Sequence, residues 1–156
     1  MLKNLSILFI FCLLTIGVTA MVASDRVRPS GPVADFSFTD MNGNSGTLHG
    51  LNGPVVLHFW ATWCAPCIDE MPKLIRKANA TPGTTYLLIS VDRDQSLVRE
   101  FFFKMTVKAK ENTRIIHDPS MAITADLFKI SRFPESLFLS ADKKKTHHAV
   151  GPREWQ

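Results

Sequence analysis

Two cysteines separated by two residues are the part of this sequence best suited to chemistry. They are Cys64 and Cys67, in the segment Trp63-Cys64-Ala65-Pro66-Cys67, which lies between an apolar run and a helical pattern. A helix N-terminus offers unpaired N–H groups and the positive end of the helix dipole, which stabilise a thiolate and lower its pKa. A thiolate on Cys64 can attack a disulfide, and Cys67, one turn further on, can resolve the mixed disulfide. The spacing therefore predicts dithiol redox chemistry.

Metal binding and a purely structural disulfide are the competing interpretations of this pair. A disulfide that closes so small a loop removes little entropy from the unfolded chain. A structural zinc site normally needs four ligands, and His147 and His148 are adjacent, so on a strand they would point to opposite faces. Thiolates suit Cu(I), so a copper-binding or metallochaperone module that uses Cys64 and Cys67, with His58 as a further ligand, remains an alternative.

The third cysteine, Cys12, belongs to an N-terminal leader. Residues 5–24 carry no charge and follow Lys3. This pattern predicts that residues 1–24 are a signal peptide, cleaved after Ala20, or an uncleaved signal anchor that holds the protein to a membrane through residues 5–24. Residues 25–32 form a linker. Either leader places the following domain outside the cytoplasm, where disulfides persist.

Composition limits the rest of the chain to one ordinary domain. The full chain of 156 residues is 46% hydrophobic and contains three cysteines, too few for the disulfide scaffold of a small secreted protein. The formal net charge is +4. The one basic run, Lys143-Lys144-Lys145, lies between two apolar segments, a pattern typical of a solvated hairpin turn. We therefore expect a soluble globular domain without a nucleic-acid partner.

The elements that must position the dithiol alternate between strands and helices. Residues 55–60 form a nearly continuous apolar run, typical of a strand that is buried on both faces. Helical spacing follows in residues 68–78. The other predicted strands are residues 36–38, 47–49, 86–91, 115–116, 136–140 and 149–150, and the other predicted helices are residues 97–105 and 120–128. The alternation predicts an α/β domain with a central, partly parallel sheet that is covered on both sides.

The segment of residues 59–72, FWATWCAPCIDEMP, resembles the active-site segment of thioredoxin-fold proteins. Within that fold it is similar to the exported TlpA/ResA/CcmG group of thiol-disulfide oxidoreductases, several of which serve cytochrome c maturation. The resemblance covers roughly residues 33–155 and implies a thioredoxin-like domain at 33–156. Such a domain has three α/β/α layers, a mixed central sheet, an N-terminal β-hairpin and a family-type insertion. Residues 151–155 resemble the start of the family's last helix, which we expect to be short or absent.

The resemblance also implies roles for individual residues. Cys64 would be the exposed nucleophile, Cys67 the buried resolving thiol, and Glu70 an acid that transfers protons near the thiols. Pro134 matches the family's cis-proline, and a cis bond there would place the Phe133 backbone beside the cysteines for hydrogen bonds with an extended substrate.

Three further residues complete the expected site. Trp63 is expected to cover the dithiol, and Glu135 resembles the acid that follows the cis-proline in the cytochrome-maturation proteins. His58 is a departure, because thioredoxins carry a buried aspartate at this position and the exported group often carries asparagine. It is either a satisfied core histidine or a proton relay.

The sequence therefore predicts a periplasmic or otherwise extracytoplasmic enzyme that reduces protein disulfides. We expect no cofactor, because the redox-active group is the Cys64–Cys67 disulfide itself. Apocytochrome c or a copper-site protein is the expected substrate, and a thiol protein in the membrane the expected electron donor. Besides the copper module, the alternatives are a thiol peroxidase, a neighbouring thioredoxin-fold class that relies on a single reactive cysteine, and a redox-inactive interaction domain.

Overall fold

A computed structural model describes residues 31–156, and residues 32–156 form one compact unit. The leader predicted at residues 1–24 and most of the linker lie outside the described residues. No helix within residues 31–156 is both long enough and apolar enough to cross a membrane.

A five-stranded mixed sheet lies at the centre of this unit, in the order β5-β4-β3-β6-β7. The five strands are β3 (Val55–Trp60), β4 (Thr85–Ser90), β5 (Thr113–His117), β6 (Glu135–Leu139) and β7 (Lys145–Val150). β3, β4 and β5 are parallel, β6 is antiparallel to β3, and β7 is antiparallel to β6. All six residues of β3 are buried, as the apolar run predicts for the middle strand of a covered sheet.

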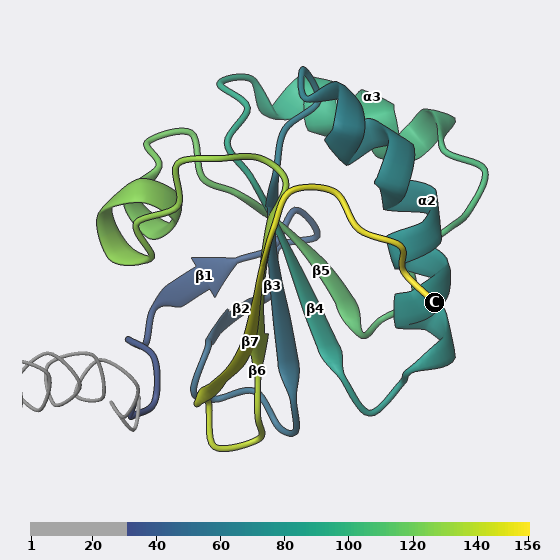
Figure 1. The fold of residues 1–156 in the computed structure, drawn as a ribbon. Helices are drawn as coiled ribbons and strands as arrows, with labels where there is room; N and C mark the ends of the chain where they lie inside the picture. Colours follow the sequence, from purple (N-terminus) through teal and green to yellow (C-terminus); the bar gives the residue numbers. More distant parts are fainter. Residues whose placement is uncertain (1–30) are drawn as a thin grey trace, which may run out of the picture. The chain divides into compact units, whose positions relative to one another are not determined.

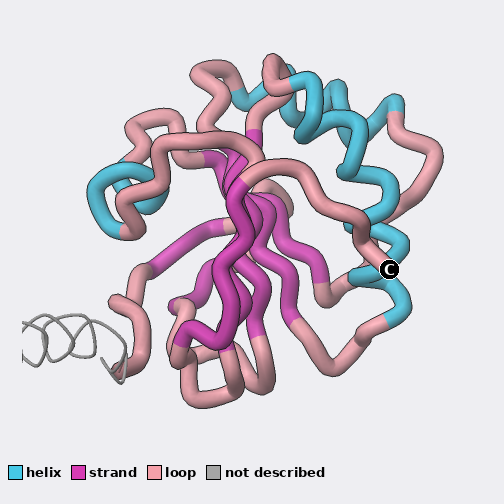
Figure 2. The backbone as a smooth tube through the Cα atoms, in the orientation of Figure 1, coloured by secondary structure: helices cyan, strands magenta, loops and turns pink. Residues whose placement is uncertain are grey.

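Two layers cover the sheet, as Figures 1 and 2 show. The helices α2 (Ala65–Ala80) and α3 (Gln95–Lys104) lie on one face. The hairpin of β1 (Ser37–Thr39) and β2 (Ser45–Thr47) lies on the other face with η1 (Ala122–Leu127), the short green helix in Figure 1. The predicted α/β fold and its N-terminal hairpin are confirmed.

The alternation of side chains along β3 divides the core into two clusters. Val56 and Trp60 face α2, where they pack with Met71, Leu74 and other apolar residues of the helix. Val55, Leu57 and Phe59 face the hairpin and η1. His58 shares the α2 face with Val56 and Trp60, because residues two apart on a strand point the same way. The strand therefore carries a titratable side chain into the layer that also holds the dithiol.

Three predicted details are corrected by the structure. The second hairpin strand is Ser45–Thr47 rather than residues 47–49, and the helix expected at 120–128 is a six-residue π-helix. Lys143, expected in a solvated turn, is only 4% exposed. Its Nζ donates to the carbonyl oxygens of Gly53 and Ala141, which replace the water that a buried ammonium loses.

The C-terminal segment, residues 151–156, is not helical, in line with the expectation of a short or absent last helix. It runs from β7 back to α2, as the yellow end of the chain shows in Figure 1. The main-chain N–H of Gly151 donates to the Pro134 carbonyl, and Lys73 of α2 pairs with Glu154 at 2.8 Å. Trp155 packs against the cluster beneath α2. The segment thus covers part of the sheet face that a final helix would cover.

Candidate active site

Cys64 and Cys67 form a disulfide at the start of α2, with their Cα atoms 5.3 Å apart. Cys64 is the N-cap residue of the helix, and Pro66 lies in the first turn, where its missing N–H leaves no helical hydrogen bond unmade. Cys64 is 7% exposed and Cys67 is fully buried. The structure therefore gives the expected ranking of the two sulfur atoms, although Cys64 is less exposed in the disulfide than expected.

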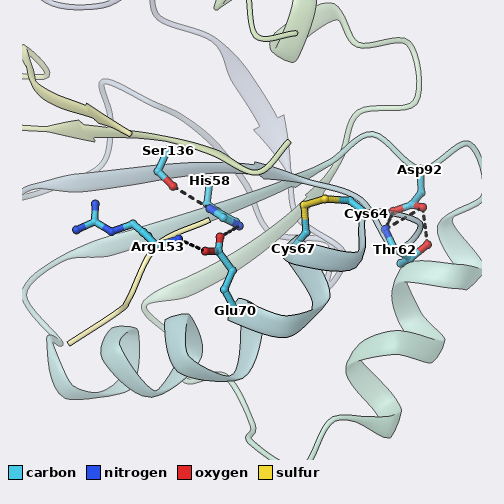
Figure 3. The surroundings of a disulfide bond; sticks show 8 residues. All are labelled: His58, Thr62, Cys64, Cys67, Glu70, Asp92, Ser136 and Arg153. Carbon is cyan, nitrogen blue, oxygen red and sulfur yellow. Dashed lines mark hydrogen bonds and ion pairs between the residues drawn. A yellow bond between two sulfur atoms is a disulfide. The ribbon is translucent and has the colours of Figure 1, made fainter. Parts of the chain in front are cut away.

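Asp92 holds the loop that leads into Cys64, and sequence reasoning missed it. Its carboxylate accepts hydrogen bonds from the main-chain N–H of Thr62, from the Thr62 hydroxyl at 2.6 Å and from the Ser90 hydroxyl at 2.7 Å. Asp92 has no exposed surface. The Asp92 side chain thus joins the ends of β3 and β4 on the Cys64 side of the disulfide (Figure 3).

A signal for Asp92 was present in the sequence. β3 and β4 are parallel neighbours, so their carboxyl ends meet at one edge of the sheet, where α/β folds place their ligands. Cys64 follows the end of β3 by four residues and Asp92 follows the end of β4 by two. A polar residue directly after the next strand was therefore a candidate for contact with the dithiol loop.

Trp63 and Phe133 form an aromatic surface beside the dithiol. Trp63 is 66% exposed, and its ring meets that of Phe133 edge to face, with 5.8 Å between the ring centres. The Phe133–Pro134 bond is cis, which confirms the expectation drawn from the resemblance. The structure thus brings together two residues that are 70 positions apart in the sequence. The exposed Trp63 ring and the partly buried Phe133 ring suit an extended peptide with apolar side chains.

His58 and Glu70 lie next to each other on the side of the disulfide opposite to Asp92 (Figure 3). The two atoms that face each other, His58 Nε2 and Glu70 Oε1, are 3.5 Å apart and have no other hydrogen-bond partner within residues 31–156. His58 Nδ1 forms a 2.9 Å hydrogen bond with the Ser136 hydroxyl. Glu70 follows Cys67 by one helical turn, so both point to the same face of α2. A proton between Nε2 and Oε1 would satisfy both atoms.

Burial sets the protonation of this pair. It lowers the pKa of His58 to about 3, and the nearby Arg153 cation contributes to the same shift. Burial raises the pKa of Glu70, while the main-chain N–H of Arg153 opposes that rise by donating to the carboxylate at 2.7 Å. The imidazole is therefore neutral at neutral pH, and the carboxyl group takes up a proton more readily than a solvated one. Arg153 is the second residue of the site that sequence reasoning missed.

Glu135 is not brought to the His58–Glu70 pair. Ser136 faces His58, so Glu135, its neighbour on β6, points to the opposite face of the sheet. There it is 6% exposed and hydrogen-bonds with His148 of β7. Across residues 31–156 no three His, Cys, Asp or Glu side chains gather closely enough to hold a metal ion.

Comparison with known proteins identifies similar chains. The model of the AhpC/TSA family matches residues 29–148. The thiol-disulfide oxidoreductase ResA of Bacillus cereus is 25% identical over 134 residues, which cover 81% of this chain and 72% of ResA. The sporulation thiol-disulfide oxidoreductase A of Bacillus subtilis is 24% identical over 143 residues, 85% of this chain and 83% of that protein. The soluble secreted antigen MPT53 of Mycobacterium bovis is 30% identical over 128 residues, 81% of this chain and 67% of the antigen.

Solved structures share the fold. StoA from Bacillus subtilis superposes with a TM-score of 0.67 and 21% identity, over 81% of this chain and 94% of that structure. A thioredoxin-family thiol:disulfide interchange protein from Chlorobium tepidum TLS gives a TM-score of 0.69 and 22% identity, over 83% and 90%. At these identities the likeness shows the fold, and it confirms the thioredoxin fold expected from residues 59–72.

Proposed function

Since the chain belongs to the AhpC/TSA family and has the fold and the cysteine pair of a thiol-disulfide oxidoreductase, we propose that it reduces disulfides in exported proteins. The observation that carries this proposal is the placement of Cys64 and Cys67. Cys64 is the N-cap residue of α2 and is 7% exposed, and Cys67 is fully buried one turn further on. This is the arrangement that attack and resolution require.

The first step is attack by Cys64. The N-terminus of α2 stabilises its thiolate. The thiolate forms a bond with one sulfur of the substrate disulfide, and that disulfide breaks. The other substrate sulfur leaves as a thiolate and takes a proton from solvent. The product is a mixed disulfide between Cys64 and the substrate.

The second step is resolution by Cys67. Its thiol passes a proton to Glu70, and the resulting thiolate attacks the sulfur of Cys64. The mixed disulfide breaks, and the second substrate thiol leaves after protonation. Two electrons pass from the two cysteines to the substrate, and the Cys64–Cys67 disulfide seen here is the oxidised product. A dithiol protein must then reduce it before the next cycle.

Glu70 and His58 serve this second step as the proton store. Glu70 lies on the Cys67 side of α2, and its raised pKa lets it hold the proton that Cys67 releases. His58 Nε2, 3.5 Å from Glu70 Oε1, shares that proton. His58 is therefore a proton relay in this proposal, and its hydrogen bond with Ser136 fixes the orientation of its ring.

The substrate segment lies against Trp63, Phe133 and Pro134. The exposed Trp63 ring and the partly buried Phe133 ring offer apolar contact, and the Phe133 backbone offers hydrogen bonds to an extended chain. Glu135 follows directly, but it is 6% exposed and hydrogen-bonds with His148 on the other face of the sheet. This proposal therefore gives Glu135 no contact with the substrate, contrary to the expectation drawn from the resemblance.

The proposed compartment rests on the predicted leader, and the proposed partners rest on the resemblance of residues 59–72 to the TlpA/ResA/CcmG group. An exported dithiol reductase works where protein disulfides form. Apocytochrome c or a copper-site protein is the proposed substrate, and a membrane thiol protein the proposed electron donor. The mature N-terminus, read by mass spectrometry of protein purified from the cell envelope, distinguishes the leaders. A start at Met21 supports cleavage, and a full-length protein in the membrane fraction supports an anchor.

Reduction of a disulfide-bonded test protein by the pre-reduced enzyme tests this function. Cys64→Ser should abolish the reaction, because the attacking sulfur is gone. Thr146→Ser, an exposed change on β7, is the control and should react like the wild type. An unchanged rate in Cys64→Ser would rule out the proposal. Rapid peroxide consumption or stoichiometric Cu(I) binding by the reduced protein, without disulfide reduction, would favour the peroxidase or the copper module.

The direction of the reaction is tested in the cell envelope. Thiol trapping with a reagent that adds mass to free cysteines reports the steady-state oxidation of Cys64 and Cys67. Mostly reduced cysteines support the reductase, because a reductant is kept charged by its donor. Mostly oxidised cysteines in growing cells would instead identify an oxidant.

A further inference from the structure

Arg153 lies in the C-terminal segment, far from the cysteine motif in sequence, and it contacts the His58–Glu70 pair (Figure 3). Its main-chain N–H donates to Glu70 Oε2 at 2.7 Å. Its guanidinium carbon lies 4.7 Å from the ring centre of Phe138 and 4.8 Å from that of Trp155. The Trp155 ring meets the His58 imidazole edge to face at 5.8 Å. The aromatic rings thus hold a cation beside the pair.

The guanidinium group of Arg153 has fewer partners than a buried cation usually needs. Its Nε and Nη1 atoms are inaccessible and have no hydrogen-bond acceptor among residues 31–156. The two ring faces attract the cation but do not replace those acceptors. Arg153 as a whole is half-buried, and a cation with these N–H groups unpaired favours a negative charge nearby. The Glu70 carboxylate, already bonded to the main chain of the same residue, is in place to supply it.

The other titratable groups around Glu70 are paired, uncharged or exposed to solvent. They come from three elements and are His58 of β3, Glu154 of the C-terminal segment, and Cys67, Asp69 and Lys73 of α2. Lys73 is paired with Glu154, and both are exposed. Asp69 is exposed to solvent, His58 is neutral, and Cys67 is in the disulfide. Arg153 is therefore the cation near Glu70 that has no ion-pair partner among the described residues.

Glu70 and Arg153 also line the same cavity. Its volume is about 340 Å³, and it is lined by Pro66, Glu70, Arg153 and their neighbours on α2 and the C-terminal segment. Glu70 itself is 5% exposed, and its Oε1 atom is inaccessible. The C-terminal segment and α2 therefore meet beside a largely buried carboxyl group.

We propose that Arg153 is a positioning residue of the redox centre: its N–H and its cation hold Glu70 as a carboxylate directed at His58, ready to take the proton of Cys67. Arg153 acts through Glu70. The inference rests on the proposed disulfide reduction, because only the resolution step uses that proton. It also assigns a function to the C-terminal segment beyond covering the sheet.

A titration of the Glu70 side chain tests the electrostatic part directly. The 13C chemical shift of its carboxyl carbon is followed with pH by NMR in the oxidised protein. Arg153→Met keeps the main-chain donor and a long side chain between the rings but removes the cation. In this variant the midpoint of the Glu70 titration should rise by about one pH unit. This is the low end of the pKa shift that one opposite charge causes. Arg153→Lys should stay close to the wild type. Arg76→Met, the same change at an exposed arginine of α2, should leave the midpoint unchanged.

The second readout is the pH dependence of disulfide reduction in a single turnover. Glu70 must be ionised to accept the proton, so the rate falls at acidic pH. In Arg153→Met the pH at which this acidic limb begins should be higher by the same amount. Below that limb the variant should react about tenfold more slowly, since one pH unit changes the ionised fraction tenfold. Far above the limb it should match the wild type, which a variant with a disrupted fold would not do.

The outcomes separate this inference from the proposed function. An unchanged Glu70 midpoint in Arg153→Met would overturn the inference, as would a shifted midpoint with an unchanged rate profile. Either result leaves the role of Cys64 standing if Cys64→Ser is inactive. An active Cys64→Ser would instead refute the proposed function, whatever Arg153→Met shows.

Discussion

His58 links the stability of the fold to pH. Burial lowers its pKa in the folded protein to about 3, against an ordinary value of 6.5. Between these two values the unfolded chain binds a proton that the folded protein does not bind. The free energy of unfolding must therefore decrease as the pH falls through this window. The raised pKa of Glu70 acts in the opposite sense, because the fold then holds a proton that the unfolded chain releases as the pH rises.

Replacement of His58 should remove this pH dependence. The comparison is best made with Glu70→Gln present in both proteins, so that the opposing carboxyl group is absent. From pH 6.5 down to about 3, the protein that retains His58 should lose stability relative to His58→Asn by at most about 1.4 kcal/mol per pH unit. Urea unfolding at several pH values measures the slope. His147→Asn, an exposed histidine, is the control. Parallel curves for the proteins with and without the His58→Asn change would contradict the account.

Asp92 should be important for both stability and rate. Asp92→Ala leaves the buried donors of Thr62 and Ser90 without their acceptor. We expect a loss of about 2–4 kcal/mol in the free energy of unfolding and slower disulfide reduction, because the loop before Cys64 loses its anchor. Asp126→Ala removes a more accessible aspartate from η1 and should change neither. A wild-type rate in a folded Asp92→Ala protein would show that the loop needs no such anchor.

At the scale of elements, α2 both positions the cysteines and covers the sheet. Its buried stripe includes Met71, Leu74 and Ile75, at the spacing of one helical face. α3 contributes a single fully buried residue, Val98, and leaves Leu97 46% exposed. Packing of α2 should therefore dominate the stability of this layer.

Two leucine substitutions test that difference. Leu74→Ala opens a cavity under α2 and should reduce the free energy of unfolding by about 2–5 kcal/mol. Leu97→Ala removes a half-exposed side chain from α3 and should cost less than about 1 kcal/mol. Denaturant unfolding measures both. Equal losses of unfolding free energy in the two variants would contradict the conclusion that the packing of α2 dominates the stability of this layer.

The elements were predictable wherever a local pattern specifies them. The apolar run of β3 and the helical spacing of residues 68–78 give period and burial directly, and the motif places Cys64 at the helix start. Residues 120–128 were harder, because a π-helix of six residues is too short for its side-chain pattern to distinguish it from an α-helix. Lys143 is buried by carbonyl groups of Gly53 and Ala141, one of them 90 residues away, so no local pattern reports it.

The site was predictable only in part, because some of its contacts join residues that are far apart in the sequence. Cys64, Cys67 and Glu70 share one helix, so their spacing shows that they lie together. The contacts of Asp92 with Thr62 and of Arg153 with Glu70 span 30 and 83 residues and depend on the order of strands in the sheet. The pairing of His58 with Glu70 likewise requires that β3 lie directly beneath α2.

At the scale of the whole molecule, both apolar clusters are built from residues of one unit, 32–156. A chain that begins at residue 25, without the predicted leader, should therefore fold and unfold in one cooperative transition. Far-UV circular dichroism and tryptophan fluorescence should give the same midpoint, because Trp60 and Trp155 lie in the same cluster as α2. Different midpoints for the two signals would show that residues 32–156 unfold in more than one step.

The central claim is that Cys64 attacks the substrate and Cys67 resolves the intermediate. The measurement that tests it most directly is the mass of the adduct formed when each reduced single-cysteine variant meets a disulfide-bonded test peptide. Cys67→Ser should accumulate a mixed disulfide, and peptide mapping should place it on Cys64. Cys64→Ser should form little adduct, because Cys67 is fully buried. An adduct that forms equally fast on Cys67, or none on Cys64, would contradict the account.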